Sequence, residues 1–242
     1  YNNFMQKKIV IIGASGAIGK AFVDLYSKID TVEHVFSFSK TQIDFISSKV
    51  TSFPIDIEDE ISVKNAAEVI GTQKIDIVIV ATGILHNKDF GPEKSIKDLD
   101  PDNFLKVLKI NTIGPAIIGK HFLPLLTKDQ KSVFAFLSAR VGSISENKLG
   151  GWYSYRASKT ALNQVVKNFS IEVCRTNPNA VILGLQPGTV ESNLSEPFKK
   201  NVAREKLFTP EYSAEMLAKV ILNSTQKNSG DLLSWDGEII NP

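Results

Sequence analysis

The sequence predicts an α/β fold: a single-domain, Rossmann-like, doubly wound parallel sheet of about seven strands flanked by helices. Three observations predict it. Short β-branched runs alternate with longer helical stretches, the short runs are apolar throughout, and a glycine-rich stretch follows the first of them. Strands that are apolar on both faces are typical of a parallel sheet covered by helices on both sides.

Seven short apolar segments are predicted to be strands. They are Lys8–Ile12, His34–Phe38, Val50–Ile55, Ile75–Ala81, Ser132–Ser138, Ala180–Gln186 and Asp231–Trp235. Five longer stretches are predicted to be helices. They are Ala17–Ile29, Glu58–Ile70, Pro101–Leu126, Tyr153–Arg175 and Pro210–Leu222. Proline suits the first turn of a helix, and Asp100 and Thr209 precede the two prolines as expected caps.

We expect one domain over residues 1–242, because no repeat, low-complexity linker or composition break divides the chain. The net charge of +2 comes from mixed charges, which excludes an obvious nucleic-acid surface. No apolar run reaches the ~18 residues of a membrane span, and no signal peptide is recognisable, so a cytoplasmic protein is expected. Cys174 is the one cysteine, expected as a small core residue, and no metal-ligand spacing is present.

A dinucleotide site is predicted where the first strand candidate ends. The strand runs into Gly13-Ala14-Ser15-Gly16-Ala17-Ile18-Gly19 and then into a helix. Glycines there permit a tight turn and let the backbone approach a pyrophosphate at the helix N-terminus. Because ligands bind beyond the carboxyl ends of parallel strands, the residues after the other strands are also candidates.

The second strand candidate bears on the choice of nicotinamide cofactor. An NAD site usually has a carboxylate there, ~20 residues after the glycines, but this chain has Ser39 followed by Lys40. Lys40 attracts a 2′-phosphate, which favours NADP(H); the alternative is NAD(H), with Asp44 turned toward the ribose. Asp56, with Ile57 beside it, can bind adenine or cap the following helix.

Tyr155 and Lys159 are the predicted catalytic pair. They lie four residues apart near the start of a predicted helix, so their side chains share one face. A nearby ammonium group favours the ionised form of a phenol and moves its pKa toward neutral pH. Ser138 ends the neighbouring strand, where its hydroxyl can hold a substrate carbonyl against the phenol. Tyr153 competes with Tyr155 but lacks a lysine four residues later.

Asn111 lies inside the predicted helix Pro101–Leu126, four residues before Pro115. Proline cannot donate the usual hydrogen bond to the carbonyl of Asn111. The pattern predicts a kink there, with a carbonyl free to hold a water; an ordinary proline kink is the alternative.

In this order and spacing, the residues resemble the short-chain dehydrogenase/reductase family over nearly the whole chain. The matching elements are Gly13–Gly19, Asp56-Ile57, Ala81–Gly83, Asn111, Ser138, Tyr155-x-x-x-Lys159 and Pro187-Gly188-Thr189. The resemblance extends to the C-factor-like and sniffer-type carbonyl reductases through Ser138–Ser143, Gly150–Tyr155 and Trp235-Asp236-Gly237. Thr82 departs from the family pattern, since asparagine is frequent there.

The resemblance implies a role for each matching residue. Tyr155 exchanges a proton with the substrate oxygen, and Ser138 orients and polarises the carbonyl. Lys159 binds the nicotinamide ribose and lowers the pKa of Tyr155, while Asn111 positions a water. The implied cofactor-binding residues are Gly13, Ser15, Gly16, Ala17, Ile18, Gly19, Ser39, Lys40, Asp56, Ile57, Ala81, Thr82, Gly83, Pro187, Gly188, Thr189 and Val190.

The expected activity is therefore an NADP(H)-dependent oxidoreductase acting on a carbonyl/alcohol pair, in a monomer or a homo-oligomer such as a dimer or tetramer. Residues 191–208 are the expected substrate lid, and His86 is expected in an exposed loop or at the substrate mouth. The alternative from another class is a cofactor-sensing regulatory protein with little turnover. A sugar-nucleotide epimerase is disfavoured, because little chain follows Gly188.

Overall fold

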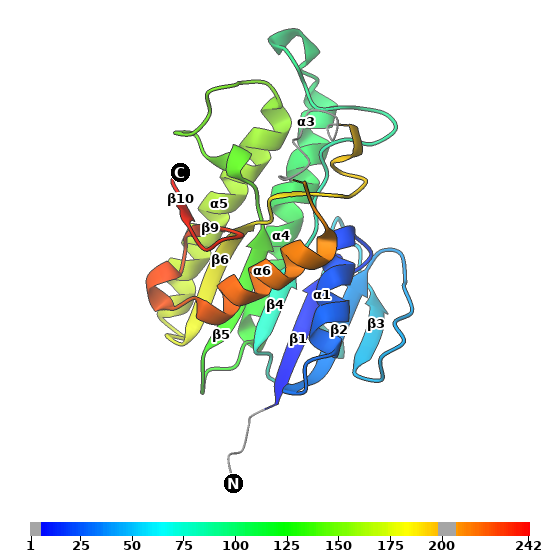
Figure 1. The fold of residues 1–242 in the computed structure, drawn as a ribbon, viewed down its shortest axis with the longest axis vertical. Helices are drawn as coiled ribbons and strands as arrows, with labels where there is room; N and C mark the ends of the chain where they lie inside the picture. Colours follow the sequence, from blue (N-terminus) through cyan, green and yellow to red (C-terminus); the bar gives the residue numbers. More distant parts are fainter. Residues whose placement is uncertain (1–5, 198–206) are drawn as a thin grey trace.

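The computed structural model describes residues 6–197 and 207–242. Their backbone forms one eight-stranded sheet with the order β10-β9-β6-β5-β4-β1-β2-β3, shown in Figure 1. Seven strands run parallel, and β10 pairs antiparallel with β9 at one edge. The predicted doubly wound fold is therefore confirmed, with one short edge strand that the sequence did not indicate.

The seven parallel strands coincide with the predicted segments. They are β1 (Lys7–Ile12), β2 (Val32–Ser39), β3 (Val50–Pro54), β4 (Ile77–Val80), β5 (Ser132–Leu137), β6 (Ala180–Gln186) and β9 (Leu232–Ser234). The additional edge strand is β10 (Ile239–Ile240). Two further two-residue strands pair with each other: β7 (Thr189–Val190), just before the predicted lid, and β8 (Leu207–Phe208), the last two residues of that lid. Residues 198–206 of that lid lie outside the described residues.

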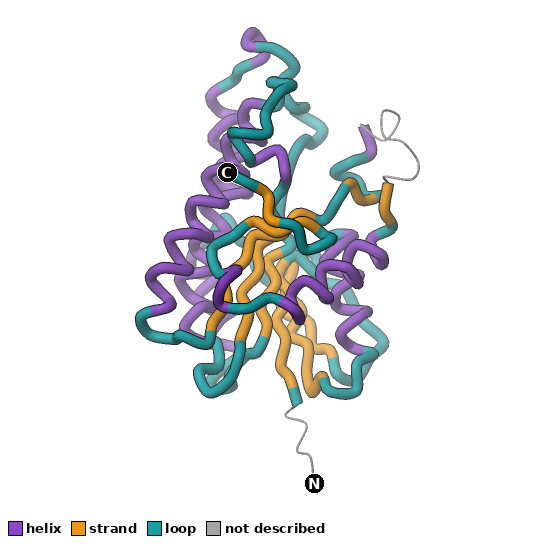
Figure 2. Tube along the Cα trace, turned by 60° about the vertical axis from the view of Figure 1, so that its left-hand side comes forward, coloured by secondary structure: helices purple, strands orange, loops and turns teal. Residues whose placement is uncertain are grey.

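Helices cover both faces of the sheet (Figures 1 and 2). On one face, α1 (Ala17–Ser27) and α6 (Pro210–Asn223) pack on one apolar cluster that includes Phe22 and Leu217. On the other face, α2 (Glu60–Val69), α4 (Gly114–Phe122) and α5 (Tyr153–Cys174) pack on a second cluster. The strands are buried from both sides, which explains why they are apolar throughout.

The expected caps are present at two helices. The Asp100 carboxylate accepts a hydrogen bond from the backbone N–H of Asn103 at 2.9 Å, at the start of α3 (Pro101–Leu108). The Thr209 hydroxyl accepts one from the N–H of Tyr212 at 3.2 Å, at the start of α6. Each contact satisfies a backbone donor that the helix leaves free in its first turn.

The predicted helix over Pro101–Leu126, with its expected kink near Asn111, is divided into shorter elements. The chain forms α3, a π-helical turn over Lys109–Ile113, α4 and a 3₁₀ turn over Leu123–Leu125. The interruption contains Asn111 and ends just before Pro115, where a missing N–H breaks the α-helical pattern. Proline therefore interrupts the helix at the predicted place, but as a π-helical turn.

The structure also bears on Cys174 and on membrane-spanning helices. Cys174 is exposed at the last residue of α5 and is not a core residue, because most of the last turn of this helix faces solvent. No helix among residues 6–197 and 207–242 has both the length and the apolar character that crossing a membrane requires.

Candidate active site

The parallel register aligns the carboxyl ends of the central strands at one edge of the sheet. Ile12 pairs with Val80 on β4 and with Phe38 on β2, and Leu137 pairs with Leu185 on β6. The segments after these strands therefore meet, as the sequence predicts for a ligand site in this architecture.

A cleft of about 270 Å³ opens at this edge. Ten of the residues predicted to bind cofactor line it: Gly13, Ser15, Gly16, Ser39, Lys40, Asp56, Ile57, Ala81, Thr82 and Gly83. The other predicted residues, Ala17, Ile18, Gly19 and Pro187–Val190, are not among its lining. Three lining residues escaped the sequence analysis, namely Ile55, Glu58 and Ile110, because neither an apolar strand end nor a helix interior carries a recognisable signal.

The glycine-rich loop folds back tightly on the sheet. The N–H groups of Gly13 and Ala14 both donate to the Phe38 carbonyl, and Gly16 N–H donates to the Gly13 carbonyl at 3.0 Å. Gly13 has φ +90°, a conformation that favours glycine, and a Cβ there would lie 2.7 Å from the Ala81 carbonyl oxygen. No side chain caps the N-terminus of α1 at Gly16, and Ser15 and Gly16 are exposed, which suits a bound pyrophosphate.

Thr82 provides a second sign of a ligand at this edge. Its Oγ1 atom is buried and has no hydrogen-bond partner among the residues that the structure describes. A buried hydroxyl without a partner costs free energy, so a polar group of a bound molecule would satisfy it. Together with the open loop, this orphaned atom shows that the cleft fits a polar cofactor.

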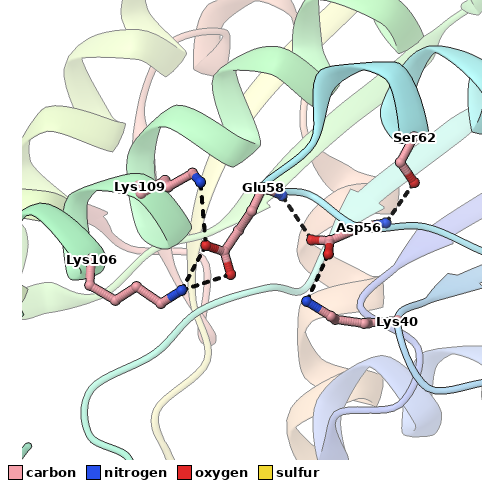
Figure 3. Close-up of polar contacts among 6 residues, drawn as sticks. All are labelled: Lys40, Asp56, Glu58, Ser62, Lys106 and Lys109. Atoms are coloured by element: carbon pink, nitrogen blue, oxygen red, sulfur yellow. Dashed lines mark hydrogen bonds and ion pairs between the residues drawn. The ribbon is translucent and has the colours of Figure 1, made fainter.

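Three charged residues of the cleft lining, Lys40, Asp56 and Glu58, take part in ion pairs, as Figure 3 shows. Lys40 Nζ lies 2.7 Å from Asp56 Oδ2, and this pair raises the pKa of Lys40 and lowers the pKa of Asp56. Glu58 pairs with Lys106 at 2.7 Å and with Lys109 at 3.6 Å. These ion pairs tie the segment after β3 to both β2 and α3.

The structure tests one alternative at the strand ends, the role of Asp56 as a helix cap. Asp59, and not Asp56, caps α2, because its side chain accepts from the N–H of Ile61. The Ser39 hydroxyl turns inward to the Thr41 carbonyl, while Asp44 is exposed. Lys40 is the cation at the end of β2, with a side chain that is 70% exposed and thus accessible to an anion.

Tyr155 and Lys159 lie on the buried face of α5, as their spacing predicts. Their exposed fractions are 7% and 3%, and Lys159 Nζ lies 5.8 Å from the centre of the Tyr155 ring. The Lys159 ammonium donates to the Leu137 carbonyl at 2.9 Å. Tyr153, the competing tyrosine, is 37% exposed.

The pKa values of this pair differ from the expectation. Burial raises the pKa of Tyr155 to about 12 and lowers the pKa of Lys159 to about 8. The ammonium does not bring the phenol toward neutral pH here, because burial disfavours the charged form of both groups. In this structure the phenol is a neutral hydroxyl, a state suited to donating a proton.

The buried Lys159 makes stability depend on pH in a defined direction. Its pKa falls from 10.5 to about 8 on folding, so between these values only the unfolded chain holds the proton. The free energy of unfolding therefore rises with pH through this window, by up to about 3 kcal/mol. Tyr155, whose pKa rises from 10.0 to about 12, acts in the opposite direction only above about pH 10.

Urea unfolding of the cofactor-free protein tests this prediction. The wild type and a Lys159→Met variant are compared between about pH 7 and about pH 10. We expect the wild type to gain stability relative to the variant as pH rises, since methionine removes the titrating group. Parallel curves for the two proteins would show that Lys159 keeps its ordinary pKa.

Asn111 and Ser138 complete the set of predicted catalytic residues. The Asn111 side chain is fully buried and bonds to both the N–H and the carbonyl of Ile84, at 2.7 and 2.8 Å. It also donates to the Ser158 hydroxyl at 3.0 Å, which links the loop after β4 to α5. Ser138 follows β5, and its hydroxyl donates to Oδ1 of Asn163 at 2.6 Å.

The N-terminus of α5 rests on a residue that the sequence analysis missed. Glu93 is buried, its carbonyl accepts the N–H of Trp152 at 2.5 Å, and both its carboxylate oxygens lie 3.3 Å from the N–H of Ser154. A carboxylate at that position also suits the helix dipole. Trp152 takes the left-handed conformation, φ 50°, and sets its ring edge-to-face on Tyr155 at 6.1 Å.

His86 lies in the loop after β4 and is only partly exposed. Its Nε2 atom lies 3.0 Å from the Asn193 carbonyl and 3.1 Å from the Leu194 carbonyl, in the described part of the predicted lid. The segment after β4 thus contacts the segment after β7.

Comparison with known proteins agrees with this geometry. The sequence pattern of the family described as short chain dehydrogenase matches residues 7–203. A 1-hydroxy-2-glutathionyl-2-methyl-3-butene dehydrogenase from Rhodococcus sp. (strain AD45) is 30% identical over 200 residues, which cover 81% of this chain and 83% of the relative.

Two solved structures share the fold over nearly the whole chain. The NADPH-bound carbonyl reductase from chicken fatty liver superposes with a TM-score of 0.84 at 22% identity, covering 98% of this chain and 99% of its own. The carbonyl reductase Sniffer of D. melanogaster superposes with a TM-score of 0.83 at 20% identity, covering 98% and 100%. The predicted likeness to sniffer-type proteins is confirmed at the level of the fold.

Proposed function

This chain belongs to the short-chain dehydrogenase/reductase family, and on that basis we propose that it is an NADP(H)-dependent carbonyl reductase with Tyr155 as general acid. One observation carries the proposal: Lys159 Nζ donates to the carbonyl of Leu137, the residue before Ser138, and lies 5.8 Å from the centre of the Tyr155 ring. The same ammonium borders the cleft, since a Cβ at Gly83 would lie 3.5 Å from it. The reverse reaction, oxidation of an alcohol, uses the same groups with Tyr155 as base.

The cofactor, when bound, supplies the hydride, and the protein's part is orientation and proton transfer. The glycine loop and the Thr82 hydroxyl would hold the dinucleotide, with Lys159 at its ribose. Pro187–Val190 would flank the nicotinamide end. Ser138 would donate a hydrogen bond to the substrate carbonyl and place its oxygen against Tyr155.

The neutral phenol favours the reductive direction. Reduction leaves an alkoxide-like oxygen that needs a proton, and a phenol with a pKa of about 12 donates one readily to so basic an atom. Oxidation needs a phenolate instead, which burial disfavours.

An absorbance assay of NADPH oxidation with a panel of aldehydes, ketones and quinones tests the proposal. We expect oxidation that depends on the added carbonyl compound. Tight cofactor binding with no turnover on any compound would favour a cofactor-sensing protein instead.

Lys40 is proposed to select NADP(H) over NAD(H). Its exposed ion pair with Asp56 is worth little in water, so a 2′-phosphate carrying close to two charges can draw the ammonium away. The NADPH-bound carbonyl reductase structure supports this choice of cofactor.

A Lys40→Ala variant is expected to raise the KM for NADPH by about 10-fold to 100-fold, since a charge-assisted contact of about 1.5–3 kcal/mol is lost. The KM for NADH should change little, because NADH has no 2′-phosphate. Lys106→Ala serves as the matched control, since Lys106 also pairs with a carboxylate near the cleft. If the KM values for NADPH and NADH changed equally, Lys40 would not select between the two cofactors.

A further inference from the structure

The Ser138 hydroxyl is already engaged in this structure, and its partner lies outside the four predicted catalytic residues. Its Oγ atom donates to Oδ1 of Asn163 at 2.6 Å, a short hydrogen bond. Asn163 comes from α5, one helical turn after Lys159, so it lies on the same face as the catalytic lysine.

A serine hydroxyl has one proton to donate. In the proposed reaction that proton must reach the substrate carbonyl, but here Asn163 accepts it. The Ser138 proton cannot be donated to both acceptors, so the substrate carbonyl and the Asn163 oxygen compete for it. An amide also carries an NH₂ group, and a half turn about its last side-chain bond presents that group instead. Ser138 then accepts a hydrogen bond and keeps its own proton for the substrate.

The surroundings of Asn163 allow this rotation. Within residues 6–197 and 207–242, Oδ1 accepts from Ser138 and Nδ2 has no hydrogen-bond partner, so one contact holds the amide. Asn111 differs, because Ile84 and Ser158 hold its amide at three points. Gly142 faces the Asn163 amide, and a Cβ there would lie 3.0 Å from Nδ2. The missing side chain of Gly142 therefore leaves room beside this amide.

We propose that Asn163 is a positioning residue for Ser138: its amide holds the hydroxyl oxygen in place and releases the hydroxyl proton to the substrate by presenting NH₂. This inference rests on the proposed carbonyl reductase function and adds a residue to its proton chemistry. The hydroxyl stays on Asn163 while the site is empty. It turns to the substrate carbonyl when one binds, and no bond other than hydrogen bonds is made or broken.

Two substitutions separate this role from simple packing. Asn163→Asp keeps the size of the side chain but, when ionised, can only accept, so it retains the Ser138 proton. We expect kcat to fall about 100-fold, with KM for the carbonyl compound and the dissociation constant for NADPH within about 3-fold of wild type. Asn163→Ala removes both the accepting oxygen and the donating NH₂ group and leaves the Ser138 hydroxyl free to rotate. We therefore expect a smaller loss of kcat, about 10-fold.

Asn168→Asp is the matched control, because it makes the same change at an exposed amide of the same helix. Its kcat should equal that of wild type. Thermal unfolding of each variant checks that the fold persists.

The decisive comparison repeats both Asn163 substitutions in a Ser138→Ala protein. With no hydroxyl to position, neither should lower the remaining kcat more than about 2-fold. The proposal is overturned if Asn163→Asp is as active as wild type, or if its loss is equally large without Ser138. If the wild type shows no carbonyl-dependent NADPH oxidation, the proposed reductase function is overturned together with the role of Asn163. If the wild type is active and only the Asn163 results fail, the reductase function stands and the role of Asn163 is overturned.

Discussion

A Tyr155→Phe variant is expected to lose about 10³-fold in kcat while binding NADPH as tightly as the wild type. The substitution removes one hydroxyl and leaves the ring, which packs edge-to-face with Trp152. The residue is only 7% exposed. General acid catalysis by a positioned side chain contributes about 10²-fold to 10⁴-fold, and all of that contribution is lost here. The measurement is the initial rate of NADPH oxidation at saturating carbonyl compound.

Tyr153→Phe is the control for this experiment. It removes a hydroxyl from the same turn of α5, but Tyr153 is 37% exposed. Its kcat should stay within about 2-fold of wild type, because no proton transfer is assigned to it. If kcat falls equally in the two variants, the loss comes from a disturbed start of α5, and Tyr155 is not the general acid.

A Gly19→Ala variant is expected to destabilise the fold by about 1–3 kcal/mol and to weaken cofactor binding at least 10-fold. A Cβ at Gly19 meets the carbonyl of Gly13, with its oxygen 2.2 Å and its carbon 2.8 Å away. Both atoms belong to the backbone and cannot rotate away as a side chain could, so the loop must open to relieve the overlap. An opened loop no longer presents the N-terminus of α1 to a phosphate.

Chemical unfolding and an NADPH titration measure the two effects. Gly16→Ala is the control for stability, because its Cβ has 3.4 Å to the nearest atom and its backbone, at φ −75° and ψ 157°, suits any residue. A Gly19→Ala protein as stable as Gly16→Ala would contradict the close approach of α1 to the glycine loop.

Much of the fold and of the candidate site could be predicted, because the signals were local. A buried parallel strand must be apolar on both faces, and the polar or small residues that follow it must lie at the edge of the sheet. Lys40, Asp56 and Thr82 were found in this way, and the cleft brings them together. Four-residue spacing on a helix placed Tyr155 and Lys159 correctly on one face.

Other features depend on contacts between distant segments, which local patterns do not carry. Glu93 supports the start of α5 from a loop 61 residues away, and nothing in its own neighbourhood indicates this. Asn163 reads as an ordinary polar helix position until β5 brings Ser138 against it. The pKa of Tyr155 is raised and not brought toward neutral pH as expected, for the same reason, because burial depends on the whole fold.

The transfer of a labelled hydride tests the central claim most directly. The protein is supplied with NADPH carrying deuterium at both hydrogen positions on C4 of the nicotinamide and with the best carbonyl compound of the panel, and the alcohol formed is analysed by mass spectrometry. We expect one deuterium on the carbinol carbon of the wild-type product, and almost no alcohol from Tyr155→Phe. An unlabelled alcohol, or a product formed equally by the variant, would contradict the account.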